Sequence, residues 1–586
     1  MSAEQLITQH IETWASALQT RSTAGRGNNG KIDLYGIKKL RELILELAVR
    51  GKLVPQDPND EPASELLKRI AAEKAELVNQ GKIKKQKPLQ EISEDEKPFK
   101  LPVGWEWVRL GHICTKLTDG SHNPPKDNGS GYPMLSSQNI QNDKIDIENP
   151  SRYVCEDGFT QENNRTSIQK DDVLLTIVGS LGRSAVVTND TKFVLQRSVA
   201  VLTSGLLPSY LSNYFKSVTA QLYFLENGKG TAQKGIYLGQ LSQMIIPVPS
   251  FIEQERIDSR IKELMDICNQ LEQQSLTSLE AHSQLVETLL ATLTNSQNAK
   301  ELAENWARIS QHFDTLFTTE ASIDALKQTI LQLAVMGKLV PQDPNDEPAS
   351  ELLKRIEQEK AQLMKEGKIK KQKPLPPVSD EEKPFGLPEG WEFIRLGDLT
   401  SKMGSGSTPR GGQSAYVTEG IPFLRSQNVW NEGLRLDDVV YIDKNTHSKM
   451  DGTKVFPGDI LLNITGASLG RTLIFPDHII EANVSQHVTI IRLLLGELAP
   501  FVHLAIKSPL IQNLVWRRQV GMAIEGLSKK TLELFEFPVP PLLEQHRIVT
   551  KIDELFIICE QLKSRLRSAQ QTQLHLADAL TDAALS

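Results

Sequence analysis

Residues 45–89 read LELAVRGKLVPQDPNDEPASELLKRIAAEKAELVNQGKIKKQKPL, and residues 331–375 repeat them as LQLAVMGKLVPQDPNDEPASELLKRIEQEKAQLMKEGKIKKQKPL. The two copies, which we call the connectors, are identical at 37 of 45 positions. An offset of 286 residues relates them, as from Leu53 to Leu339. Self-similarity over this length predicts two halves of equivalent structure.

The repeat continues beyond the connectors, but its later parts are less alike. The weaker matches pair KPFKLPVGWEWVRLG (97–111) with KPFGLPEGWEFIRLG (383–397), DDVLLTIVGSLGR (171–183) with GDILLNITGASLGR (458–471), and IPVPSFIEQERI (246–257) with FPVPPLLEQHRI (537–548). The connectors therefore stay close while the blocks after them share only framework residues. This contrast favours two equivalent scaffold positions that present two different surfaces.

The order of these segments predicts five regions and an α+β fold. Each divergent block mixes short β-like runs, such as DVLLTIV and HVTIIRL, with turn residues and short helices. We expect a helical N-terminal region with the first connector (1–100), a first divergent α+β domain (101–250), a central helical region with the second connector (251–386), a second divergent α+β domain (387–540) and a C-terminal helix (541–586).

A heptad pattern follows each divergent block. Apolar residues step by four and three along Ile257, Ile261, Leu264, Cys268 and Leu271, and again along Ile548, Ile552, Leu555, Cys559 and Leu562. This spacing is typical of a coiled-coil seam, in which the cysteines act as small buried hydrophobes. Two such helices of about 40 residues, roughly 60 Å long, predict an antiparallel coiled coil that fixes the distance between the two domains.

Composition restricts the class of protein. The chain has 586 residues, which predicts about three to five domains. Its net charge of −7 argues against indiscriminate coating of DNA but allows a local basic face. We expect no membrane span and no signal peptide, and four scattered cysteines fit a cytoplasmic protein.

Two motifs suggest catalysis but are incomplete. HNPPK (122–126) is similar to the Asn-Pro-Pro-aromatic motif with which amino-group methyltransferases hold a base, yet Lys126 stands where the aromatic belongs. GSGST (404–408) lacks the GK[ST] ending of a phosphate-binding loop. We therefore expect a proline-stiffened loop and a turn, with no catalytic residue and no metal site. The basic GKIKKQKP runs (81–88 and 367–374) are either a solvated linker or a strap that contacts phosphates or a partner.

These residues carry a resemblance to a known family. Type I restriction–modification specificity subunits have a similar lead-in. The resemblance lies in GKLVPQDPNDEPASELLKRI followed by KPF-LP-GWE. DGSHNPP (119–125) and GSGSTPRGG (404–412) resemble the loop that opens their target recognition domains, and IPVPSFIEQERI and FPVPPLLEQHRI are similar to their domain-to-helix junctions. The long stretches before each domain suggest a branch with extended N-terminal and central regions.

The resemblance implies a non-catalytic subunit that reads double-stranded DNA with a bipartite asymmetric target. It implies two methyltransferase subunits, which carry S-adenosylmethionine and methylate adenine N6, and two restriction/translocase subunits, which use ATP and Mg²⁺. This chain itself is expected to hold no cofactor. Two rival interpretations are an enzyme that acts alone and a scaffold for two protein partners, and the divergent domains argue against the scaffold.

The residues that read DNA have to be ranked by chemistry. Arg pairs with guanine, and Asn or Gln pairs with adenine, from loops on one face of a domain. In the first domain we expect DNA contacts from Ser121, His122, Lys126, Gln138, Asn139, Arg183, Gln196, Arg197, Gln233 and Lys234. In the second domain we expect them from Ser407, Thr408, Arg410, Arg425, Gln427, Asn428, Arg471, Gln486, His487, Arg517 and Arg518.

Two qualifications apply to these residues. The pairs Gln138/Asn139 and Gln427/Asn428 recur between the halves, which leaves a framework role open. Basic side chains in such loops also contact phosphates more often than bases.

Overall fold

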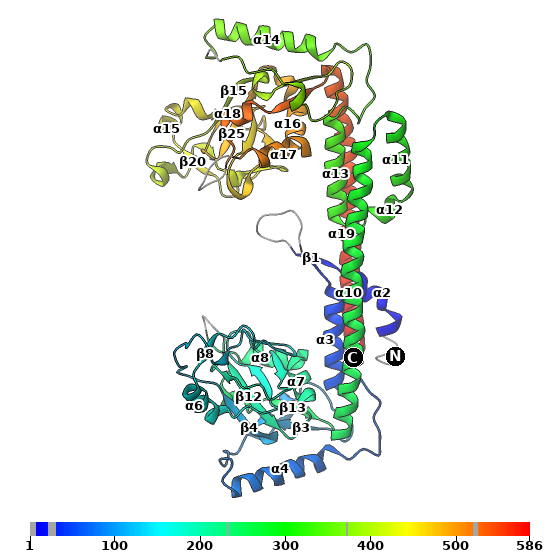
Figure 1. The fold of residues 1–586 in the computed structure, drawn as a ribbon, viewed down its shortest axis with the longest axis vertical. Coiled ribbons are helices and arrows are strands. Elements are labelled where there is room, and N and C mark those ends of the chain that lie inside the picture. Colours follow the sequence, from blue (N-terminus) through cyan, green and yellow to red (C-terminus); the bar gives the residue numbers. More distant parts are fainter. Residues whose placement is uncertain (1–6, 22–30, 231–233, 371–372, 520–525) are drawn as a thin grey trace. The chain divides into compact units, whose positions relative to one another are not determined.

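The computed structural model describes residues 7–21, 31–230, 234–370, 373–519 and 526–586 (Figure 1). Contacts divide the chain into two compact units. Unit 1 comprises residues 1–21, 32–277 and 570–586, and unit 2 comprises residues 22–31 and 278–569. Each unit contains one divergent block, one connector and parts of the two long helices that carry the heptads.

The globular domain of unit 1 is built from short strands. Its strands are β3 (Glu106–Arg109), β4 (Cys114–Asp119), β5 (Tyr132–Leu135), β6 (Ile140–Gln141), β7 (Lys144–Ile145), β8 (Arg152–Val154), β9 (Val173–Thr176), β10 (Ser184–Val186), β11 (Val194–Leu195), β12 (Val199–Ser204) and β13 (Ile245–Val248). The main antiparallel sheet has the order β10-β9-β12-β4, and a smaller sheet has the order β11-β5-β8. β9 is buried along its whole length, as its apolar sequence VLLT requires.

The helices of unit 1 cover these sheets and lead into them. They are α2 (Ile11–Ser16), α3 (Tyr35–Val49), α4 (Ala63–Asn79), η1 (Glu94–Glu96), α5 (Leu110–Ile113), α6 (Glu156–Thr166), α7 (Pro208–Lys216), α8 (Val218–Asn227) and α9 (Leu238–Leu241), while β1 (Gln19–Arg21) and β2 (Lys31–Asp33) form a two-stranded sheet. Ser217 separates α7 from α8, because its hydroxyl accepts the N–H of Ala220 and so caps a new helix.

The globular domain of unit 2 repeats this plan. Its strands are β14 (Glu392–Arg395), β15 (Thr400–Ser405), β16 (Tyr416–Val417), β17 (Ile421–Leu424), β18 (Val429–Trp430), β19 (Gly433–Leu434), β20 (Val440–Ile442), β21 (Lys454–Val455), β22 (Ile460–Asn463), β23 (Thr472–Ile474), β24 (Ala482–Val484), β25 (Val488–Leu493) and β26 (Glu536–Val539). The order β15-β25-β22-β23 mirrors β4-β12-β9-β10 of unit 1. The second sheet has the order β16-β20-β17-β24-β21, in which β17 and β24 are parallel, as β5 and β11 are in unit 1.

Short helices complete this domain. They are η2 (Asp380–Glu382), η3 (Leu396–Leu399), η4 (Gly412–Ala415), η5 (Ser426–Asn428), α15 (Lys444–Ser448), η6 (Asp451–Thr453), η7 (Gly466–Ser468), η8 (Gly496–Leu498), α16 (Ala499–Lys507), α17 (Pro509–Arg517) and α18 (Lys529–Glu533). Ser508 caps α17 as Ser217 caps α8. In both domains the first and last strands pair, β3 with β13 and β14 with β26, so the chain enters and leaves each domain at one place.

Two long helices follow the domains at the heptad segments. They are α10 (Phe251–Asn295) and α19 (Leu542–Leu585), and between α10 and the second domain lie α11 (Ala299–Gln311), α12 (Phe313–Leu316), α13 (Glu320–Val335) and α14 (Ala349–Lys365). The heptad positions Ile257, Ile261, Ile548 and Ile552 are all buried. Cys268 is buried too, and burial raises the pKa of its thiol to about 11, so it packs as a neutral side chain.

Side-chain pairs fix the direction of α19 in unit 2. Asp324 and Lys327 of α13 pair with Lys563 and Glu560, so α13 and α19 run antiparallel. His282 lies 3.1 Å from the carbonyl of Thr315, and Lys338 donates to the carbonyl of Thr294, so α13 runs parallel to α10. The parts of α10 and α19 in unit 2 are therefore antiparallel.

Unit 1 has the same arrangement, with α3 in the place of α13. Arg41 bonds Asn269 while Gln56, after α3, bonds Glu253, so α3 and α10 are antiparallel. Tyr35 bonds Asp578, and Lys52 bonds the carbonyl of Leu585, so α3 and α19 are parallel. Each unit thus contains three packed helices, in which α3 or α13 lies beside the antiparallel pair α10 and α19 that the heptads predict. The heptads marked one seam, but α3 and α13 are also apolar and need burial.

The connectors are nearly identical because they attach each domain to a long helix. In unit 1, Gln56 and the indole N–H of Trp105 both donate to Glu253, and Asp60 pairs with Arg256. The same contacts recur in unit 2, where Gln342, Trp391, Glu544, Asp346 and Arg547 take these places. Burial raises the pKa of Glu253 and of Glu544, while the hydrogen bonds to these carboxylates oppose that shift.

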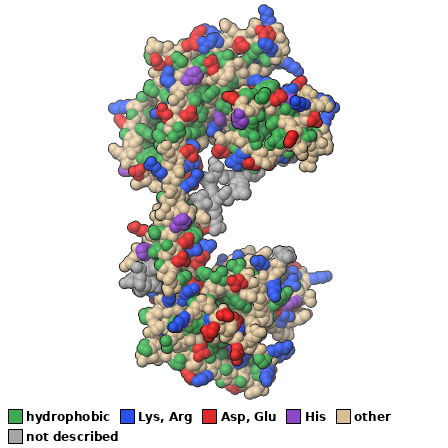
Figure 2. All heavy atoms as spheres, turned by 180° about the vertical axis from the view of Figure 1, so that it is seen from behind, with side chains coloured by type: hydrophobic (Ala, Val, Ile, Leu, Met, Phe, Trp, Pro, Cys, Tyr) green, Lys and Arg blue, Asp and Glu red, His purple; other side chains and the backbone are tan. Residues whose placement is uncertain are grey.

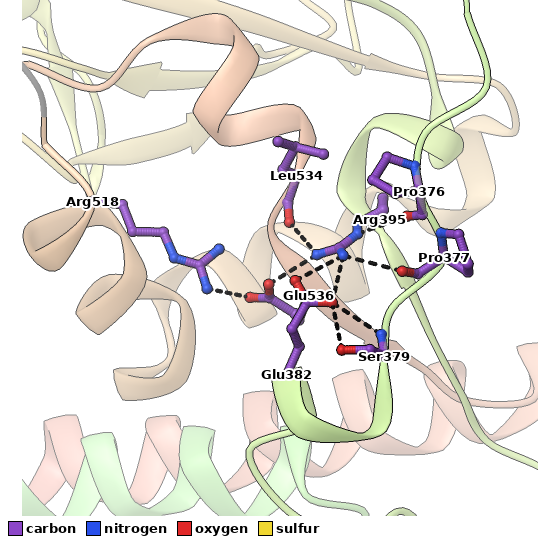
Figure 3. A network of polar contacts seen from close by, with 8 residues as sticks. All are labelled: Pro376, Pro377, Ser379, Glu382, Arg395, Arg518, Leu534 and Glu536. Carbon is purple, nitrogen blue, oxygen red and sulfur yellow. Dashed lines mark hydrogen bonds and ion pairs between the residues drawn. The ribbon is translucent and has the colours of Figure 1, made fainter.

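A buried arginine fixes the segment that directly follows each connector. Arg395 donates to the carbonyls of Pro376, Pro377 and Leu534 and to the carboxylates of Glu382 and Glu536 (Figure 3). The Arg395 guanidinium, with the backbone N–H of Ser379, lowers the pKa of Glu382 to about 2. In unit 1, Arg109 and Glu96 form the matching pair, at 2.8 Å, and the pKa of Glu96 is also about 2. This network ties the connector to the paired first and last strands.

Candidate nucleic-acid interface

The loop that opens each domain begins with a glycine that the fold requires. A Cβ on Gly120 would lie 2.2 Å from the carbonyl oxygen of Leu195, and one on Gly406 would lie 1.8 Å from that of Val484. Only glycine permits this approach. The next residues then pair with the neighbouring strand, since the N–H of Ser121 donates to Leu195 and the N–H of Ser407 donates to Val484. The opening loops are therefore anchored at their first residues.

Three of the predicted readers are buried and bonded within the chain. Ser121 is 4% exposed, and its hydroxyl donates to Glu162. Asn139 accepts the N–H of Ser136 and donates to the carbonyl of Asn149. Asn428, which is fully buried, accepts the N–H of Arg425 in the same way. Their polar atoms are satisfied inside the domain, so the structure favours the framework role for both asparagines.

Other predicted residues of unit 1 lie on the surface. Lys126, Gln138, Arg197 and Lys234 are exposed, and Arg183 is half-buried. The guanidinium groups of Arg183 and Arg197 form no hydrogen bond or ion pair with a residue that the structure describes.

The remaining residues of this set have partners or lie outside the described chain. His122 is exposed, and Asp119 holds it at 2.8 Å. Gln196 donates to the hydroxyl of Ser151. Gln233 lies outside the described residues.

In unit 2, three predicted residues come together around one hollow of about 370 Å³. Gln427, Arg471 and His487 line it, and so do Trp430, Thr465 and four small residues of η5 and η7: Ser426, Gly466, Ala467 and Ser468. These residues come from four separate segments, after β17, at β18, after β22 and before β25. A concave site with an arginine, an amide, an imidazole and an indole matches the groups that contact base edges.

Polar contacts hold the wall of this hollow in place. The Thr465 hydroxyl and Nδ1 of His487 are 2.6 Å apart, and Nε2 of His487 lies 3.2 Å from the amide nitrogen of Gln486. Gln486 in turn accepts a hydrogen bond from Thr408 in the opening loop. Gln427 donates to Asp438. The loops around the hollow therefore support one another.

The sequence analysis missed Trp430, which organises the hollow. The guanidinium carbons of Arg435 and Arg471 each lie 3.6 Å from the centroid of its ring. Desolvation on burial lowers the pKa of Arg471 from its ordinary value, and Arg435 adds to this shift as a second cation. Its signal in the sequence is an aromatic residue two positions after the recurring pair Gln427/Asn428, where the first half has Gln141.

The other predicted residues of unit 2 divide into two sets. Ser407, Arg410 and Arg517 are exposed. Arg425 instead bonds the carbonyl of Asp438, and Arg518 pairs with Glu536 at 2.9 Å within the connector network (Figure 3). Arg425 and Arg518 therefore stabilise the fold of the domain through contacts within the chain.

On the face that Figure 2 shows, the charged side chains are of mixed sign, with Lys and Arg interspersed with Asp and Glu. Among the residues that the structure describes, no group of three or more His, Cys, Asp or Glu side chains is placed to hold a metal ion. Across the same described ranges, no helix is long and apolar enough to cross a membrane. Local clusters such as the hollow are therefore the candidate contact sites.

Comparison with known proteins places the chain. The family model described as type I restriction modification DNA specificity domain matches residues 102–281 and 388–569. The chain is 49% identical to the type I restriction enzyme EcoAI specificity subunit and 49% identical to the EcoEI specificity subunit, both from Escherichia coli, over 100% of each chain. A solved chain from a type I R-M system is 19% identical, with 83% of this chain and 99% of that chain covered and a TM-score of 0.47.

Proposed function

The chain belongs to the specificity subunits of type I restriction–modification enzymes, and from this premise we propose that it reads a two-part target in double-stranded DNA. The globular domain of unit 1 reads one half of the target and that of unit 2 reads the other. The subunit carries out no catalysis; two methyltransferase subunits with S-adenosylmethionine modify adenine, and two restriction/translocase subunits use ATP and Mg²⁺.

One observation carries this proposal. The two domains share a backbone scaffold down to single hydrogen bonds, as at Asn139 and Asn428, yet differ in the side chains that the scaffold presents. A duplicated scaffold with different surfaces suits a target with two unlike halves. The helices α10 and α19 are the natural elements to set the spacing between the halves, because a long helix has a fixed rise per residue.

The surface of unit 1 supplies candidate readers of the first half. Arg183 and Arg197 have guanidinium donors that no described residue uses. Arginine presents a planar fork that suits guanine, while Lys126 and Lys234 suit phosphates as flexible point charges. We therefore assign base contacts to the arginines and Gln138, and backbone contacts to the lysines.

Sequencing of methylated sites in cells that express this chain with its partner subunits tests the proposal. We expect a motif with two defined halves and an undefined spacer. Arg183→Ala and Arg197→Ala are expected to relax a position in one half and leave the other half unchanged, at a cost of about 1–3 kcal/mol in binding. Lys234→Ala is the matched variant, and we expect it to weaken methylation without changing the motif. A motif that changes in both halves with Arg183→Ala would contradict one domain for each half.

A further inference from the structure

In the second domain, the indole of Trp430 contacts two arginine side chains. The guanidinium groups of Arg435 and Arg471 lie 3.6 Å from the ring centroid of Trp430, which is van der Waals contact. The indole itself is fixed, because its N–H donates to the carbonyl of Gln427 at 2.7 Å. Two cations share one aromatic side chain at the edge of the hollow described above.

The donors of these two arginines are almost unused. Arg471 forms no side-chain hydrogen bond or ion pair with a described residue, and Arg435 has one ion pair, with Glu432 at 3.9 Å. That distance is too long for a hydrogen bond. Arg471 also lines the hollow, where Gln427 and His487 face the same space. The guanidinium of Arg471 is half-buried and stacked, and no described residue uses its donors, so it suits an acceptor that comes from outside the chain.

The first domain has the same backbone at this place but different side chains. Gln141 occupies the position of Trp430, and its amide donates to the carbonyl of Gln138 at 2.9 Å, as the indole does to Gln427. Asp146 occupies the position of Arg435, since its N–H donates to Asn139 as that of Arg435 does to Asn428. Arg183 matches Arg471 in the repeat. One scaffold thus presents an amide and an anion in unit 1, and an indole and a cation in unit 2.

We infer that Arg471, held against Trp430, reads a guanine in the second half of the target, and that Trp430 and Arg435 position it for this contact. The inference rests on the proposed function. Guanine offers two acceptors, O6 and N7, on one edge, which suit the planar fork of arginine. A phosphate also accepts two hydrogen bonds from an arginine fork, and the experiment below distinguishes the two acceptors by their sequence dependence.

The test uses the complex of this chain with its methyltransferase subunits. The methylated motif of the wild type defines the second half of the target, and competition binding is then measured with duplexes that change one base pair at a time. Arg471→Lys keeps the charge and loses the fork. We expect about 10- to 100-fold weaker binding to the intact target. One G·C position is expected to lose its discrimination, while all others keep theirs.

Two further variants accompany this test. Trp430→Phe retains an aromatic face and is expected to weaken discrimination at the same position only. Arg355→Lys, an exposed arginine of α14 that pairs with Glu347, is the matched control and should change nothing. Thermal unfolding midpoints check that each variant is folded, and Trp430→Phe decides the question if Arg471→Lys unfolds.

Three results would overturn the inference or its premise separately. If Arg471→Lys weakens binding to every duplex alike and each position still discriminates, Arg471 contacts a phosphate. If Arg471→Lys and Trp430→Phe both bind as the wild type does, the cluster has no part in reading. If the wild-type complex shows no second half in its motif, the proposed function itself fails.

Discussion

Two glycines, Gly120 and Gly406, determine how closely the opening loop of each recognition domain approaches the adjacent strand. The space for their side chains is filled by the carbonyl groups of Leu195 and Val484. Neither glycine has a positive φ, so close approach and not backbone strain is the reason for glycine here. The loops that carry candidate DNA contacts depend on this approach for their anchorage.

Replacement of Gly406 by alanine is expected to destabilise the second recognition domain. Because a Cβ would meet the carbonyl oxygen of Val484 at 1.8 Å, the backbone must move, at a cost of about 1–3 kcal/mol. Urea unfolding of the two variants measures this. Gly404→Ala is the matched control, since a Cβ there meets nothing within 4 Å. Equal stability of the two variants would show that the loop yields freely.

Single residues show how far sequence reasoning reaches here. Gln427, Arg471 and His487 were chosen by chemistry and loop position, and the structure brings them around one hollow. Asn428 was chosen on the same grounds, but the turn before β18 needs its side chain to satisfy backbone groups. Residue type predicts what a side chain can bind; only the local backbone determines whether it faces solvent or the turn.

The short helices η1 and η2 couple each connector to its recognition domain. Glu96 and Glu382 each sit at the end of such a helix and pair with the buried Arg109 and Arg395. The sequence contains both members of each pair in its repeat, yet nothing in the spacing pairs them. Long-range pairing of this kind depends on the strands β3 and β14, which place the arginines.

These pairs predict an acid-sensitive contribution to stability. The folded-state pKa of Glu382 is about 2, lowered from 4.5 by the Arg395 guanidinium, so its contribution is complete above about pH 4.5 and is lost as the pH falls toward 2. We expect the difference in urea midpoint between wild type and Glu382→Gln to shrink across that range. Glu381→Gln alters the exposed neighbour and is the control. A difference that stays constant with pH would contradict the ion pair.

The long helices were easier to predict than their packing. The four–three spacing marked the buried positions of α10 and α19, since a seam leaves a period in the sequence. Helical regions before each domain were predicted, but not the packing of α3 and α13 against the long helices. Their contacts with α10 and α19 include polar pairs such as Tyr35 with Asp578 and Lys327 with Glu560, and a heptad pattern does not reveal which partner a polar side chain will meet.

Considered as a whole, the molecule is two units that are each assembled from distant parts of one chain. Each has its own recognition domain, its own connector and its own set of three packed helices, α10 and α19 with α3 or α13. If α10 and α19 set the number of base pairs between the two halves of the target, then the length of these helices is part of the DNA specificity. Neither domain alone contains that information.

Removal of one heptad from each long helix tests this role. Deletion of residues 275–281 together with 570–576 keeps the seam in phase and shortens the helices by roughly 10 Å, or about 3 base pairs. We expect the methylated motif to keep both halves with a shorter spacer. Deletion from α10 alone should break the antiparallel register and abolish methylation. An unchanged spacer in the double deletion would refute the role of the helices.

The C-terminal residues of α19 belong to unit 1, where Lys52 bonds the carbonyl of Leu585 and Tyr35 bonds Asp578. During translation the first recognition domain therefore emerges long before the helix that completes its unit. The ribosome must release residues 570–586 before α3 and α10 gain their third partner, so unit 1 is begun first and finished last. A stop codon shortly before residue 570 would therefore remove helical contacts from unit 1, although most of unit 1 is translated first.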